Sequence, residues 1–227
     1  MSASPDARSG ATALQLLLTA ERLFAQHGID GVALRAIAIE AGSANKSAIQ
    51  YHFGSKDGLL RSIFAYRLAD LVQRRNLLRA RVDPDDLRSR FEAHIVPLLE
   101  LAESGQSHYV SFVEQLERSG AAEVFAKQQD VQQSRNEFVG DMSRLLKHVP
   151  LPARTMRIEQ VQALSLHTAA ERERAVNRRG PLVPFGLYVS AVVDGFTGFL
   201  AAPVSEETRQ QAARSKRSAA VPGVRLV

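Results

Sequence analysis

Hydrogen-bonding side chains gather in one short segment near the N-terminus of the chain. Five of them lie close together: Asn45, Lys46, Ser47, Gln50 and Tyr51. His52 and Lys56 follow them along the chain. Side chains of these types reach base edges in the DNA grooves and phosphate oxygens on the backbone. The segment therefore indicates nucleic-acid binding.

Two short helices are expected to position these side chains. Helical spacing predicts one helix at Leu34–Ala41 and a second at Asn45–Tyr51. Gly42 lies between them and permits a tight reversal that a residue with a Cβ would resist. Ala48 and Ile49 place small and apolar groups on the inner side of the second helix, which leaves the polar groups outside. A helix-turn-helix has this arrangement, with its second helix in the major groove.

The sequence around this pair of helices resembles the TetR family of bacterial transcriptional regulators. Three segments carry the resemblance: Leu23-Phe24-Ala25-Gln26-His27-Gly28, then Ile37-Ala38 with Ala41-Gly42, and above all Tyr51-His52-Phe53-Gly54-Ser55-Lys56-Asp57-Gly58-Leu59-Leu60. The similarity covers about residues 12–64, roughly the family's whole DNA-binding domain. The remaining sequence is similar to the family only in length and helical character.

The resemblance implies a role for each matching position. Groove and backbone contacts are implied for Asn45, Lys46, Ser47, Gln50 and Tyr51, phosphate contacts for His52 and Lys56, and a backbone contact for Arg35. Two positions depart from the family pattern. Gln50 stands where many members carry an aromatic residue, so their base preference does not transfer. Glu21 replaces a small residue of the first helix, which predicts an altered contact there.

The chain as a whole is predicted to be all-α, because convincing strand patterns are almost absent and helical spacing recurs throughout. We expect a disordered N-terminus over residues 1–10, a three-helix DNA-binding domain over 11–55, a larger helical ligand-binding and dimerisation domain over 56–204, and a basic tail over 205–227. Ser55 is a good N-cap for a helix reaching Arg81. Further helices are expected at about 84–103, 107–118, 121–147, 153–178 and 182–202. Pro97 should kink or shorten the first of these.

Composition excludes several other classes of protein. The chain has 227 residues, no cysteine and a net charge of +5, so disulfide scaffolds and thiolate metal sites are excluded. The net charge is zero over residues 1–60, +5 over 61–82, −5 over 83–150 and +5 over 151–227, so it does not locate a nucleic-acid site. No apolar run approaches the roughly 18 residues of a membrane span, and Met1–Ser9 lacks the apolar core of a signal peptide. We therefore expect a cytoplasmic protein without a membrane partner.

Catalytic and metal-binding patterns are missing as well. The six histidines show no ligand spacing, and no nucleophile elbow, phosphate-binding glycine loop or paired-carboxylate motif is present. The sequence thus predicts no metal, no cofactor and no enzyme activity.

The segment at 182–202 carries two apolar stripes. Bulky residues form one stripe: Phe185, Val189, Val192, Phe196 and Phe199. Small residues form the other, about 110° around the helix: Ala191, Gly195, Gly198 and Ala202. We expect the bulky stripe to face the protein's own core and the small stripe to contact a second subunit. In the TetR family the last two long helices of each subunit pair in a four-helix bundle, which implies that Val161, Leu164 and Thr168 join this interface. Packing of both stripes within one chain is the alternative.

A small-molecule cavity is expected within the helices at 84–147 if the resemblance holds. Phe91, Tyr109, Phe112 and Phe138 could line it, with His94 or His108 as polar groups. The alternative is that these aromatic residues are ordinary core.

These expectations combine into a homodimeric repressor that binds a palindromic operator and is released by a small-molecule effector. The conformational change should travel through the helix at about 56–81. The sequence leaves two alternatives open, an all-α enzyme and a DNA-binding regulator without ligand control.

Overall fold

Every regular element that the structure describes is a helix, which confirms the all-α prediction. The structure is a computed structural model, and it describes residues 5–43, 47–121, 125 and 129–215. Its elements are α1 (Pro5–His27), α2 (Leu34–Glu40), α3 (Ala48–Phe53), α4 (Lys56–Arg79), α5 (Leu87–Glu103), α6 (Tyr109–Arg118), α8 (Gln129–Leu145), α9 (Leu151–Asn177), α10 (Phe185–Ala201) and α11 (Glu206–Ser215). The segment predicted as a basic tail, 205–227, contains α11, and its residues 216–227 lie outside the described residues.

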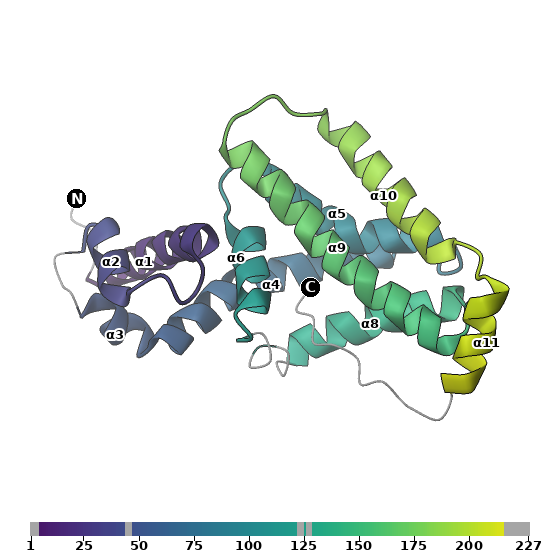
Figure 1. Ribbon diagram of the computed structural model, residues 1–227. Coiled ribbons are helices and arrows are strands. Elements are labelled where there is room, and N and C mark those ends of the chain that lie inside the picture. The colour runs from purple at the N-terminus through teal and green to yellow at the C-terminus, as the bar shows by residue number, and fades with distance from the viewer. Residues whose placement is uncertain (1–4, 44–46, 122–124, 126–128, 216–227) are drawn as a thin grey trace.

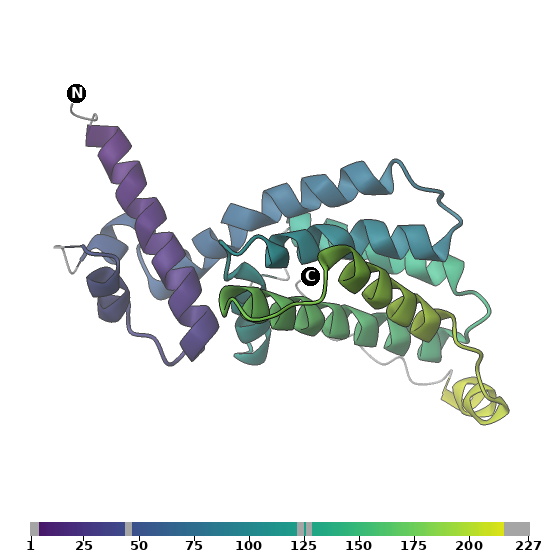
Figure 2. The same ribbon diagram turned by 90° about the horizontal axis from the view of Figure 1, so that it is seen from above.

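The helices form two groups joined by α4. Figure 1 shows α1, α2 and α3 together at one end of the molecule, and α5, α8, α9 and α10 in a larger bundle at the other. α4 leads from the first group into the second, and α6 lies between α1 and the bundle. Figure 1 shows α10 along the upper edge of the bundle, and the view from above shows it in front of the other bundle helices (Figure 2). Two helices, α4 and α6, thus connect the bundle to the N-terminal group, and a conformational change in the bundle can reach that group through either.

The first helix begins earlier than the sequence predicted. Residues 5–10 were expected to be disordered, but they form the first turns of α1. A proline in the first turn costs no hydrogen bond, because its missing N–H would have had no partner there. The single glycine at position 10 weakens a helix by about 1 kcal/mol without ending it.

The ends of α4 and α5 follow their capping residues. Ser55 caps α4 as predicted, since its Oγ accepts the Gly58 N–H at 3.0 Å. Asp86 caps α5 in the same way by accepting the Ser89 N–H at 2.9 Å, so this helix begins at Leu87. Of the two effects predicted for Pro97, a kink or an early end of the helix, the early end does not occur. Pro97 is buried inside α5, which continues to Glu103 because tertiary packing stabilises it.

An aromatic cluster connects the two groups of helices. The Phe24 ring of α1 lies 6.3 Å from the Phe112 ring of α6, between centroids, and Tyr109 lies 6.2 Å from Phe64 of α4. All four side chains are at most 1% exposed. The hydroxyl of Tyr109 donates to the Phe64 carbonyl at 3.2 Å. The hydrophobic core is therefore continuous from α1 to α6.

Within the described residues, no single helix is long and apolar enough to cross a membrane. α10 and α11 reach the required length and composition only as a pair bent by 66°.

Candidate nucleic-acid interface

α3 exposes the polar face that the sequence predicted. Ala48 and Ile49 are 4% and 1% exposed and anchor the helix on the core. Gln50 and Ser47 lie on the opposite side and are exposed, and Tyr51 is 79% exposed. The Tyr51 side chain is not packed in the core, so its ring and hydroxyl are accessible to a partner. The predicted contacts Asn45 and Lys46 lie outside the described residues.

The turn between α2 and α3 depends on Gly42. Its φ of +69° lies in the left-handed region, which side chains with a Cβ adopt at a cost. The Gly42 N–H donates to the Ile39 carbonyl at 3.0 Å, and the Ser43 N–H donates to the Ala38 carbonyl at 2.9 Å. Ile37 is buried while Arg35 is exposed, so α2 packs on α1 and leaves Arg35 facing solvent.

A tight corner joins α3 to α4 and fixes the angle between them. The Phe53 carbonyl oxygen approaches Gly58 so closely that a Cβ on Gly58 would lie 1.9 Å from it. His52 packs edge-on against Tyr51, with 4.9 Å between ring centroids. Only glycine fits at position 58 without moving the corner. The segment that resembles the family includes this residue, but its steric role becomes visible only in three dimensions.

The Lys56 side chain contacts other residues of the same chain. Its Nζ donates to the Val32 carbonyl at 3.2 Å and lies 5.6 Å from the centroid of the Phe24 ring. An ammonium group has three donors, so a phosphate contact by Lys56 stays a prediction. The observed contacts hold the start of α4 against the loop that follows α1.

The comparisons with known proteins agree with this geometry. Residues 16–63 match the family model described as bacterial regulatory proteins, tetR family. The chain carries a TetR-family DNA-binding domain. The match runs from α1 into α4 and includes both short helices, so the chain is a DNA-binding transcriptional regulator. No curated protein matches the sequence.

Glu21 of the TetR-family domain reaches the second group of helices. It is 2% exposed, and its Oε1 accepts the His108 N–H, at the start of α6, at 2.8 Å. Burial raises the pKa of this carboxyl, opposed by that hydrogen bond and by Arg67. The altered contact predicted for Glu21 is therefore made with α6. Sequence reasoning could not find it, because the partner lies 87 residues away.

A second carboxylate binds the same helix end from the other side. Glu173 of α9 is fully buried and accepts the N–H groups of Val110 and Ser111 at 3.1 and 2.8 Å. Unpaired N–H groups and the positive end of the helix dipole favour a carboxylate there. α6 is thus held between α1 and α9 through its N-terminus.

The residues expected to line one effector cavity lie in three places. Phe91, His94 and Phe138 form a group in which the His94 ring stacks on Phe138, 4.0 Å between centroids. Tyr109 and Phe112 belong to the aromatic core described above. His108 lines a separate wide groove of about 1060 Å³ between α1, α6 and α9. His94 and Phe138 of the first group border a small cavity together with Arg75, Arg79 and Arg90.

The expected dimer surface is exposed except at a few positions. Ala191, Gly195 and Gly198 of α10 are exposed, as is Leu164 of α9, while Thr168 and Ala202 are half-buried. Val161 was wrongly assigned to this surface, because it is completely buried in the monomer. Successive helical residues turn by 100°, so Val161 lies about 60° from Leu164 and faces the core. The bulky stripe packs inward except for Phe199, which is 38% exposed.

Among the described residues, no group of three or more histidine, aspartate or glutamate side chains is arranged to hold a metal ion.

Proposed function

We propose that this regulator is a homodimeric repressor that binds a palindromic operator and is released by a small molecule. The exposed polar face of α3, held in the two-helix arrangement of the matched family, is the observation that carries the proposal. In the proposed complex Gln50, with Asn45 and Lys46, reads base edges in the major groove. Tyr51, His52, Lys56 and Arg35 contact phosphates and set the register.

The surface of α10 supports the dimer. Asp194 is the one charged residue in this helix of 17, yet Val193 and Leu200 are its buried residues. Leu187 is 62% exposed, and Phe199 borders a shallow groove shared with Met156 and Leu164 of α9. An apolar surface of this kind marks a contact with another protein chain. A two-fold axis through it would present two α3 helices to successive major grooves, about 34–36 Å apart.

Two routes connect the bundle to the DNA-contacting helices. The sequence predicted α4 as the only rigid connection, and this was incomplete. α6 packs on α1 and is held there by the Glu21–His108 hydrogen bond. An effector that favours a bundle with a different position of α4 or α6 would shift the population away from the DNA-binding form. Such a regulator would act in the cytoplasm, where the DNA is.

The deciding experiment selects bound duplexes from a random library with the full-length chain. Repressor function predicts enrichment of a sequence with two inverted half-sites one helical turn apart. Failure to enrich any sequence at low salt would overturn DNA recognition and revive the all-α enzyme. Enrichment of a single half-site would overturn the dimer. Metabolites are then titrated against the selected complex, and release by none of them would favour a regulator without ligand control.

A further inference from the structure

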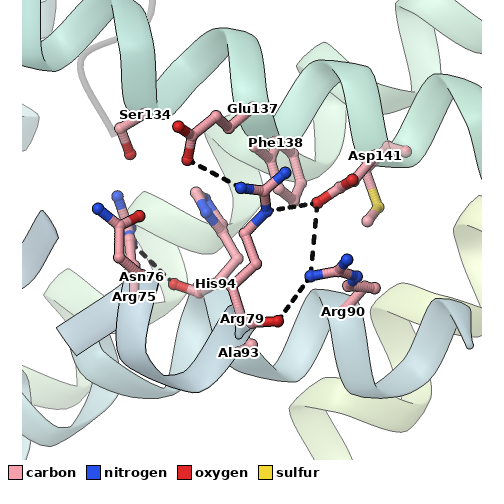
Figure 3. Close-up of a pocket in the computed structure, with 11 residues that line it drawn as sticks. Arg75, Asn76, Arg79, Arg90, Ala93, His94, Ser134, Glu137, Phe138 and Asp141 are labelled. Atoms are coloured by element: carbon pink, nitrogen blue, oxygen red, sulfur yellow. Dashed lines mark hydrogen bonds and ion pairs between the residues drawn. The ribbon is translucent and has the colours of Figure 1, made fainter. Parts of the chain in front are cut away.

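A small cavity lies between α4, α5 and α8, far from the DNA-contacting surface. Its volume is about 20 Å³, which is room for roughly one or two water-sized groups. Figure 3 shows Arg75, Asn76 and Arg79 of α4 on one side and Ser134, Glu137 and Phe138 of α8 on the other, with His94 of α5 between them.

The cavity wall carries one more positively charged side chain than negatively charged ones. Its three arginines, Arg75, Arg79 and Arg90, face two carboxylates, Glu137 and Asp141. Arg79 forms ion pairs with both carboxylates. Its Nε lies 2.8 Å from Asp141 Oδ2 and its Nη1 lies 3.2 Å from Glu137 Oε2. Arg90 lies 3.9 Å from the same Asp141 oxygen. Arg75 forms no ion pair with any carboxylate of the described residues. Arg75 is therefore the arginine whose positive charge no carboxylate of the wall balances.

Arg75 is also the most deeply buried of the three. The residue is 6% exposed, and its Nε donates to the His94 carbonyl at 2.9 Å. Its two terminal nitrogens donate to no described partner at hydrogen-bond distance. Burial lowers the pKa of Arg75 to about 10, so the guanidinium is still charged at neutral pH. A buried charge without a charged partner is unfavourable, and an anion in the space in front of the two terminal nitrogens would supply that partner.

We propose that this cavity is the effector site and that Arg75 binds the carboxylate of a small monoanion there. The two terminal N–H groups of a guanidinium match the two oxygens of a carboxylate. One unbalanced charge calls for one negative charge, and Glu137 and Asp141 would repel a second. Phe138, Ala93 and Met142 line the remaining wall, and the cavity has room for little more than the carboxylate itself, so the ligand must be as small as acetate. The assignment rests on the proposed ligand-controlled repressor.

The position of Arg75 connects such a ligand to DNA binding. Arg75 lies on the same helix as Lys56, 19 residues further along, which is about 28 Å at 1.5 Å per residue. Its bond to the His94 carbonyl holds α4 against α5. A carboxylate that draws the guanidinium into the cavity alters this contact and with it the position of α4.

The test measures thermal unfolding of the full-length chain in sodium acetate, with sodium chloride at equal ionic strength as reference. Acetate should raise the midpoint saturably, by about 5–10 °C at one hundred times its dissociation constant. Arg75→Met should abolish this shift. Arg74→Met is the matched control on the same helix, because Arg74 is half-exposed and pairs with Asp70; it should respond like the wild type.

A second variant leaves the arginine in place. Ser134→Leu fills the cavity from α8 and should also remove the acetate effect, so the test survives if Arg75→Met does not fold. Equal midpoints in acetate and chloride, or an acetate response retained in both variants, would overturn the site.

Gel shifts on the selected operator separate this inference from the repressor function. Loss of the complex in acetate for the wild type, and not for Arg75→Met, supports the effector assignment. Saturable acetate binding with an unchanged complex overturns that assignment. A protein that binds no DNA in any salt contradicts the repressor function, while the unfolding data still decide the anion site.

Discussion

At the scale of single residues, exposure separates side chains that are accessible to DNA from those that serve the fold. Tyr51 is 79% exposed, whereas Glu21, in the same DNA-binding domain, is 2% exposed and bound to α6. Both stand in the segment that resembles the TetR family. The same motif therefore holds residues that face a partner and residues that connect it to the bundle.

Arg35 offers a direct test of the phosphate contacts. It is exposed on α2, and each phosphate that a cation neutralises contributes about 0.9 to the slope of log K against log salt concentration. Arg35→Ala should weaken operator binding and reduce that slope by about 1 per subunit, hence by about 2 in a dimer. Arg209→Ala, on α11, is the control and should leave the slope unchanged. A slope unaltered in the Arg35 variant would remove Arg35 from the interface.

Glu173 predicts how stability depends on pH. Burial, aided by the charge of Glu21, raises the pKa of Glu173 to about 7, from 4.5 in the unfolded chain, although three hydrogen bonds lower it. Between these values the folded protein binds more protons, so its stability falls as pH rises from about 4.5 to 7. At 1.36 kcal/mol per unit the loss is about 3 kcal/mol. Urea unfolding at several pH values measures it.

Glu173→Gln supplies the comparison, because it keeps the size of the side chain and one acceptor oxygen for the N–H groups of α6 and does not titrate. Its stability should vary less across this pH interval than that of the wild type. Parallel pH curves for the two proteins would show that another group is responsible.

At the scale of elements, the corner between α3 and α4 sets how the recognition helix is presented. Ser55 caps α4 and Gly58 admits the Phe53 carbonyl, and both lie within one helical turn of sequence. The residues that shape the corner are therefore close together in the sequence.

Gly58→Ala tests this corner. The new Cβ would lie 1.9 Å from the Phe53 carbonyl oxygen, and backbone must move to accept it. We expect a loss of about 1–3 kcal/mol in unfolding free energy and weaker operator binding. Gly140→Ala in α8 is the matched control, because a Cβ there meets nothing within 4 Å; it should stabilise by about 0.5–1 kcal/mol. Equal effects of the two substitutions would mean that the corner is not constrained.

Local signals explain which elements the sequence could predict. Gly42 and Ser55 marked the turn and the cap because their preferences act within a few residues. The local signal of Pro97 was not sufficient to predict the end of a helix, because packing against distant segments outweighs the cost of a proline inside a helix. Glu21, Glu173 and Arg75 have partners 19 to 87 residues away, so no spacing rule reveals them. Val161 shows the same limit, because a helix position predicts a face only to within about one residue.

At the scale of the whole molecule, α10 poses the main question of assembly. It is the most apolar of the described helices, yet it lies along the edge of the bundle with Leu187, Gly195 and Gly198 exposed (Figure 1). In a monomer this surface would stay in water, which favours association. Small residues let two helix backbones approach closely, so the exposed glycines suit a contact between subunits.

Gly195 distinguishes a dimer contact from a bare surface. A Cβ at this position meets nothing within 4 Å in the monomer, so Gly195→Ala should leave a monomer intact and strengthen its helix by up to about 1 kcal/mol. Gly195→Glu would instead place a charge in the proposed apolar interface, where burial without a partner is costly. Sedimentation equilibrium should therefore show a dimer for the wild type and dissociation for Gly195→Glu, with α-helical circular dichroism retained. Operator binding should fall together with dimerisation, because a monomer presents only one α3 to the two half-sites. If the Gly195→Glu protein remains dimeric, the subunit contact must lie away from α10.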